Sequence, residues 1–170
     1  LSGIVKCWQA DEALKMQSAL LGHSQKVNSV SYSPQKRWLV SGADDGVILW
    51  DIHHRVVIKR LIDEKRDFVT CVCFSPDGSY LVIAGGGLFK KKYIHVWDID
   101  KNRVLYELSS DELETFKSSA TTGLVYSHDG RWLFSSSQDG TISIWDMSNS
   151  GCLLTTLKDN LLKRFGYRNL

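Results

Sequence analysis

The sequence predicts an all-β protein built from repeated antiparallel sheets, and three observations lead to this prediction. Short apolar runs rich in Val, Ile, Leu and aromatic residues recur along the whole chain, as is typical of strands. Gly, Asp, Ser and Pro separate these runs, as expected for turns. A tryptophan closes one run in every repeat, at intervals of 42, 47 and 48 residues. Such a period is typical of a repeated supersecondary unit.

Two landmarks define the repeat. The first is a tryptophan that is followed by aspartate in three of its four occurrences. These residues are Trp8, Trp50, Asp51, Trp97, Asp98, Trp145 and Asp146. The second is an aromatic residue followed by serine and a turn, at Tyr32, Phe74 and Tyr126. Because both landmarks recur in the same order, we interpret the sequence as successive copies of one structural unit.

The clearest copy runs from Gly22 to Asp51 and contains Gly-His, Asp-Gly and Trp-Asp pairs. On these residues the chain resembles the WD-repeat (Trp-Asp repeat) family of β-propellers, to about residue 158. The resemblance implies propeller blades of four antiparallel strands each. We expect about three and a half blades, which form a partial or open propeller.

The expected units follow the chain in order. They are a half blade at 1–21 with only third and fourth strands (Ile4–Trp8 and Ala13–Leu20), whole blades at 22–62, 63–109 and 110–158, and a tail or the start of a further blade at 159–170. Since the half blade lacks two strands, we expect the sequence to be a fragment, or a split propeller. Missing sequence, another chain or self-association would then close the ring.

Each whole blade is expected to contain four strands. In the blade 22–62 they are Val27–Ser33, Trp38–Gly42, Val47–Trp50 and Arg55–Leu61. In the blade 63–109 they are Phe68–Ser75, Tyr80–Ala84, Tyr93–Trp97 and Arg103–Leu108. In the blade 110–158 they are Thr121–Ser127, Trp132–Ser136, Thr141–Trp145 and Cys152–Lys158. Asp45-Gly46 and Asp139-Gly140 predict tight hairpins, whereas a longer Gly- and Lys-rich loop stands in the blade 63–109.

The resemblance implies a structural tetrad in the blade 22–62, formed by His23, Ser41, Asp45 and Trp50. In this relay the indole donates to the hydroxyl, the hydroxyl contacts the imidazole, and the imidazole contacts the carboxylate. Each buried group left unpaired would cost about 1–3 kcal/mol. Ser, His and Asp also form catalytic triads, but this order and spacing favour the structural relay.

The other two whole blades depart from the tetrad. In the blade 63–109, Lys65 and Ile83 replace the histidine and serine, so no tetrad is expected there. The blade 110–158 retains a partial tetrad of Ser135, Asp139 and Trp145, with Lys117 in place of the histidine.

Composition narrows the classes of function. The net charge of +2 is close to neutral and makes nucleic acid an unlikely partner. Cys7, Cys71, Cys73 and Cys152 lie in apolar runs without CxxC spacing, so we expect buried apolar residues and no metal. No apolar run is long enough for a membrane helix. We therefore expect an intracellular protein of the cytoplasm or nucleus that is not an enzyme and has no cofactor.

The resemblance implies a protein-interaction scaffold that docks peptides or protein domains within a multiprotein complex. The loops before each first strand and those between second and third strands should share one face. The candidate partner-binding residues on it are Lys26, Asp44, Lys65, Arg66, Lys90, Lys91, Lys92, Lys117 and Gln138. Clustered cations favour an acidic or phosphorylated peptide, although lysines in such loops also serve simply as solubilising residues.

Two other functions stay open. The basic face around Lys90–Lys92 and the basic tail suit nucleic acid or anionic lipid, and such binding weakens steeply with salt. A substrate receptor of a ubiquitin ligase is the other alternative. The resemblance favours an arginine two residues after Trp-Asp in such receptors, and His53, Asp100 and Ser148 stand there instead.

Overall fold

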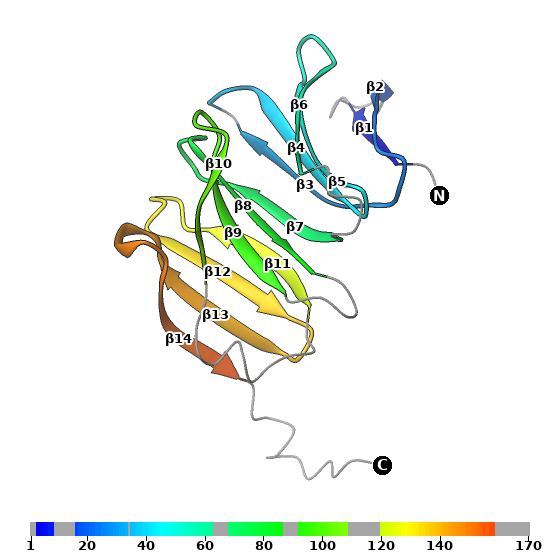
Figure 1. The fold of residues 1–170 in the computed structure, drawn as a ribbon. Coiled ribbons are helices and arrows are strands. Elements are labelled where there is room, and N and C mark those ends of the chain that lie inside the picture. The colour runs from blue at the N-terminus through cyan, green and yellow to red at the C-terminus, as the bar shows by residue number, and fades with distance from the viewer. Residues whose placement is uncertain are drawn as a thin grey trace, which may run out of the picture.

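The computed structural model describes residues 3–8, 16–33, 35–62, 68–86, 92–108 and 120–158, and these residues form fourteen β-strands and a single 3₁₀ turn (Figure 1). All strand pairs within the sheets are antiparallel. The predicted all-β fold is therefore confirmed. The predicted tail 159–170 lies outside the described residues.

The strands form four sheets, and each strand pairs with its neighbour in the chain. Sheet A contains β1 (Ile4–Trp8) and β2 (Met16–Leu21). Sheet B contains β3 (Val27–Ser33), β4 (Trp38–Ala43), β5 (Gly46–Asp51) and β6 (Val56–Ile62). Sheet C contains β7 (Val69–Phe74), β8 (Tyr80–Gly85), β9 (Tyr93–Asp98) and β10 (Arg103–Glu107). Sheet D contains β11 (Thr121–Tyr126), β12 (Trp132–Ser137), β13 (Thr141–Asp146) and β14 (Cys152–Lys158), with the 3₁₀ turn η1 (Met147–Asn149) between its last two strands.

The sheets stand side by side in chain order (Figure 1). The first strands lie next to one another, because β7 contacts both β3 and β11. Among the described residues, sheet A stands at one end of the array and sheet D at the other, so the array is open (Figure 1). This arrangement is a partial propeller.

The hydrophobic core is divided into the spaces between neighbouring sheets. Trp50 packs with residues of sheet A, Trp97 packs against the cluster between sheets B and C, and Trp145 lies in the cluster between sheets C and D. Each of these tryptophans therefore covers the preceding sheet. Trp50 and Trp145 are at most 1% exposed, and removing a side chain of this size from a packed core costs several kcal/mol.

Polar side chains of β3 also join sheets B and C. Ser29 Oγ and Ser31 Oγ accept hydrogen bonds from the backbone N–H groups of Val72 and Phe74, at 3.1 and 3.0 Å. Asn28 Nδ2 donates to the carbonyl of Val69 at 2.9 Å. These bonds satisfy the edge of β7 that has no strand beside it in its own sheet.

The cysteines differ in burial from the prediction. All four are free; Cys71 is buried, Cys7 and Cys73 are half-buried, and Cys152 is exposed. The prediction of a buried residue is wrong for Cys152, because it opens β14, the outer strand of sheet D, where only one strand lies beside it.

Candidate functional site

Four side chains of sheet B form one hydrogen-bonded chain. Trp50 Nε1 donates to Ser41 Oγ at 2.7 Å, and Ser41 Oγ lies 2.7 Å from His23 Nε2. His23 Nδ1 lies 2.6 Å from Asp45 Oδ1. The structure thus brings together the four residues that the sequence singled out as a tetrad. Antiparallel pairing places Ser41 and Trp50 on the adjacent strands β4 and β5. His23 lies in the loop before β3, and Asp45 lies in the turn between β4 and β5.

The carboxylate end of this relay is held in its charged form. Partial burial would raise the pKa of Asp45, but hydrogen bonds from the backbone and hydroxyl of Ser24 and from His23 outweigh it and lower this pKa. Ser24 N and Oγ lie 2.6 and 2.8 Å from Asp45 Oδ2. Ser41 is fully buried and already accepts the indole N–H. A catalytic serine must reach its substrate, so the geometry is that of a buried relay.

Sheets C and D contain less of this relay. In sheet C, Ile83 occupies the position of Ser41, and the buried Trp97 Nε1 has no hydrogen-bond partner among the described residues. In sheet D, Trp145 Nε1 donates to Ser135 Oγ at 2.9 Å, and Asp139 Oδ1 accepts from the backbone and hydroxyl of Thr141. Lys117, predicted in the histidine position, lies outside the described residues.

The aspartates that follow the repeat tryptophans hold the next turn. Asp51 accepts from His54, Asp98 from Lys101 and Asp146 from Ser148, in each case from a backbone N–H and a side chain. These hydrogen bonds lower the pKa of all three carboxyls. The Trp-Asp pair therefore combines a core anchor with a turn cap.

The loops predicted to share one face do lie together within each sheet. The backbone N–H groups of Asp44, Gly86 and Gln138 donate to the carbonyls of Lys26, Phe68 and Ala120, at 3.0–3.1 Å. In each whole sheet, the residue that follows the second strand is thus hydrogen-bonded to the residue that precedes the first strand. We call these strand ends the loop face.

Four of the nine candidate partner-binding residues are described, and all four lie on the loop face. Lys26 and Gln138 are exposed, whereas Asp44 and Lys92 are half-buried. Asp44 Oδ1 accepts from Asn28 at 2.7 Å. Burial lowers the pKa of Lys92, and the charge of Asp139 opposes this shift. The other five, Lys65, Arg66, Lys90, Lys91 and Lys117, lie outside the described residues.

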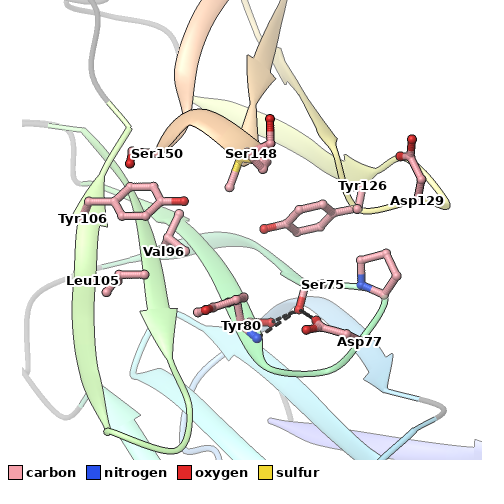
Figure 2. A pocket seen from close by; sticks show the side chains of 13 residues that line it. Ser75, Asp77, Tyr80, Val96, Leu105, Tyr106, Tyr126, Asp129, Ser148 and Ser150 are labelled. Atoms are coloured by element: carbon pink, nitrogen blue, oxygen red, sulfur yellow. Dashed lines mark hydrogen bonds between the residues drawn. The ribbon is translucent and has the colours of Figure 1, made fainter.

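A pocket of about 450 Å³ lies at the opposite strand ends, between sheets C and D (Figure 2). Tyr80 and Tyr106 of sheet C and Tyr126 of sheet D line it. Asp77 and Asp129 line it from the turns after β7 and β11. We call it the tyrosine pocket.

Comparison with known proteins decides the family. The family model described as "WD domain, G-beta repeat" matches residues 14–51, 57–98 and 110–146, which is most of the chain. The chain belongs to the WD-repeat family. Each four-stranded sheet is thus one WD-repeat blade.

One relative is a curated plant protein. The chain is 32% identical over 150 residues to the small ribosomal subunit protein RACK1y of Oryza sativa subsp. japonica. The alignment covers 86% of this chain and 42% of that relative, so the chain spans less than half of the relative's length.

The segments matched by the family model do not coincide with the blades of the structure. The segment 14–51 joins β2 of sheet A to β3–β5 of sheet B, and the segment 57–98 joins nearly all of β6 to β7–β9 of sheet C. Each of these sequence units therefore supplies the outer strand of one blade and the three inner strands of the next.

Sequence reasoning missed the tyrosine pocket. Its three tyrosines come from three different strands and form no local motif. One signal could have been found by comparing equivalent positions of the three whole blades. Tyr80 stands where the other two blades have Trp38 and Trp132.

Two kinds of site are absent from the described part of the chain. Its His, Cys, Asp and Glu side chains form no group of three or more that could hold a metal ion. None of its helices has the length and apolar character needed to cross a lipid bilayer.

Proposed function

We propose that this chain is a non-catalytic interaction platform, which docks peptides or protein domains within a multiprotein complex. The observation that carries the proposal is the WD-repeat match over three successive segments. The geometry supports it, because the most reactive side chains of the repeat are engaged in internal bonds. His23, Ser41 and Asp45 hold a blade together rather than facing a substrate.

A ribonucleoprotein complex is the first setting to test. RACK1y is named as a small ribosomal subunit protein, and we extend this association to the present chain as a proposal. The full chain would be mixed with purified small ribosomal subunits and sedimented through sucrose. We expect the chain to move with the subunits, whereas a chain that stays at the top of the gradient would contradict this association.

The general proposal has its own test. The tagged full chain would be used to capture proteins from a cell extract, with the Trp50→Ala variant as a matched control because it removes the core of one blade. Reproducible enrichment of a stoichiometric protein partner by the native chain alone is the expected result. No enrichment over the control would contradict the platform function.

We place this function inside the cell, where four free cysteines remain reduced.

We further propose that the loop face receives an acidic or phosphorylated peptide. Lys26 and Lys92 on this face support the idea, together with the lysines that the sequence places in the neighbouring loops. Charge reversal at Lys90–Lys92 should then abolish capture of such a peptide. Unchanged capture would contradict this proposal, and a steep loss with added salt for RNA or vesicles would favour the other ligands.

The face of sheet D that points away from sheet C suggests a further contact. Side chains alternate along its strands, so Val125, Ile142 and Leu157 point away from sheet C, and each is 43–57% exposed. At the other seams such faces pack against a neighbouring sheet. We propose that a sheet from a second copy of this chain covers this face, and light scattering of the full chain tests this contact. A stable dimer is the expected result, and a monomer would contradict the contact.

A further inference from the structure

We call the boundary between two neighbouring sheets a seam. At the strand ends opposite the loop face, an ion pair bridges the seam between sheets B and C. Lys36 Nζ lies 3.2 Å from Asp100 Oδ1, which joins a turn of sheet B to a turn of sheet C. Lys36 also lies over the ring of Trp38, 4.9 Å from its centroid. Phe74 and Ile99, at the same strand ends, are buried in the core cluster between the sheets.

The equivalent positions at the seam between sheets C and D are different. Tyr126 pairs with Leu133 on the next strand, as Phe74 pairs with Leu81, so these two aromatic residues are equivalent. By the same register Gly78 stands in the place of Lys36, and Ser148 in the place of Asp100. Neither can form the closing ion pair, and this seam contains the tyrosine pocket instead.

Two of the tyrosines that line the pocket are held in their neutral form. Burial raises the pKa of Tyr126 far above its ordinary value, and Tyr106 and Tyr80 contribute to the same shift. Burial also raises the pKa of Tyr106, with a contribution from Tyr80. Tyr106 and Tyr126 therefore keep their protons at neutral pH. Figure 2 shows Tyr106 and Tyr126 extending toward each other from the two sheets.

Two carboxylates give the pocket its charge. Burial opposes ionisation of Asp77, but hydrogen bonds from Ser75 and Ser79 lower its pKa. Hydrogen bonds from Ser127 and Arg131 lower the pKa of Asp129. Neither Lys nor Arg is among the described residues that line the pocket.

Arg131 carries a positive charge that acts on Asp129, but it is not part of the lining. Arg131 follows Asp129 by two residues, and its guanidinium lies 4.5 Å from the centroid of the Trp132 ring. Val96 and Leu105 add apolar surface to the wall on sheet C, and Met147 adds it on sheet D. The pocket thus combines apolar walls, aromatic rings and negative charge.

We infer that the tyrosine pocket binds the side chain of an arginine or lysine from a partner protein. The aliphatic stem would lie along Leu105 and Met147. The cationic head would lie among the tyrosine rings, whose faces attract cations, within reach of the carboxylates. This inference rests on the proposed platform function and names the chemistry of one partner contact.

The charges argue against other occupants. A phosphate or carboxylate would be repelled by Asp77 and Asp129. A purely apolar side chain would remove phenol and carboxylate groups from water without giving them a hydrogen-bond partner, which is costly. A long-stemmed cation satisfies both the apolar and the polar part of the lining.

The direct test uses short peptides and the full chain with its tyrosine rings labelled for NMR. The probes are acetylated, amidated pentapeptides that carry Arg, Lys, norleucine or Glu between glycines. We expect the Arg and Lys peptides to shift the ring signals of Tyr80, Tyr106 and Tyr126 at millimolar concentration, and their relative affinities to tell the two cations apart. Equal shifts with the norleucine peptide, or none with either cation, would overturn the inference.

Substitutions locate the binding. Tyr106→Leu removes one ring and keeps apolar volume, and we expect roughly five-fold weaker binding of the cationic peptide, the size of a modest cation–π contact. Tyr32→Leu is the matched control, because Tyr32 occupies the position of Tyr126 on β3 of sheet B, and no residue of sheet B lines the pocket. Thermal melts of both variants check folding. Equal binding by Tyr106→Leu and the native chain would contradict the inference.

The outcome is separable from the platform function. If the chain captures a protein partner and Tyr106→Leu captures it equally well, while the peptides do not bind, the pocket inference fails and the platform remains. If no partner is captured but cationic peptides bind, the platform function fails and the pocket remains a cation site.

Discussion

Sheets B and C have the same four-stranded architecture, but the indole N–H of the repeat tryptophan is hydrogen-bonded only in sheet B. In sheet B, the indole N–H of Trp50 enters a relay through Ser41 to His23. In sheet C, Ile83 replaces the serine, and the buried indole N–H of Trp97 has no partner among the described residues. The blade therefore does not depend on the relay. Sheet C forms without the relay, and we expect the relay to add stability where its residues are present.

The largest expected effect comes from removing the anchor of sheet B. Trp50→Ala should lower the free energy of unfolding by about 3–5 kcal/mol, because a large aromatic side chain leaves a packed core. Urea unfolding measures this change. Trp8→Ala is the control, since Trp8 is 56% exposed. Similar effects for the two variants would contradict the assignment of Trp50 to the core.

A smaller loss should follow from breaking the relay while keeping the anchor. Ser41→Ala leaves Trp50 Nε1 and His23 Nε2 without their shared partner, which should cost about 1–3 kcal/mol. Thermal and urea unfolding report the change. A neutral result would show that sheet B, like sheet C, does not need the relay for its stability.

The reverse substitution sharpens the comparison. Ile83→Thr places a hydroxyl at the position in sheet C that Ser41 occupies in sheet B. The substitution removes apolar packing but offers Trp97 Nε1 a hydrogen-bond acceptor. It should therefore lower the free energy of unfolding by about 1 kcal/mol less than Ile94→Thr does. Ile94 is a suitable control because it is also buried, on β9. Equal costs in urea unfolding would mean that the hydroxyl does not reach the indole.

The relay also predicts a dependence on pH. The pKa of Asp45 is lower in the folded chain than its ordinary value, so its contribution is present above that value and is lost as pH falls through the folded pKa. The stability difference between the native chain and Asp45→Asn should therefore shrink below about pH 4. Urea unfolding at several pH values checks this. A difference that is constant with pH would contradict the charged state of Asp45.

The smallest effect is expected at the closed seam. Lys36→Met removes the ion pair with Asp100, whose side chain is 74% exposed. Exposed pairs contribute at most about 1 kcal/mol, and salt screens them. Thermal melts at low and high salt should show a slight difference that disappears at high salt. A large loss would mean that this pair, rather than core packing, holds sheets B and C together.

The fold could be predicted because its signals are local. Strand-length apolar runs, Asp-Gly turns and the repeated tryptophan each lie within a few residues of one another. The relay residues could be singled out for the same reason, since they keep fixed offsets within one repeat. In sheet C the replacement of serine by Ile83 could also be seen directly in the sequence.

The tyrosine pocket could not be predicted, because it depends on how two sheets meet. Tyr80, Tyr106 and Tyr126 are far apart in the chain, and only the packing of sheet C against sheet D brings them together. The exposure of Cys152 likewise depends on its place at the outer edge of a sheet rather than on its apolar neighbours.

The offset between sequence unit and blade has a consequence for how such a chain grows by tandem duplication. A copied unit such as 57–98 carries the outer strand of sheet B and the inner strands of sheet C. Duplication therefore copies a joint between blades rather than a free-standing blade. Every inserted unit is interlocked with the blades on both sides as soon as it is made, so the array lengthens without acquiring a loose boundary at which it could come apart.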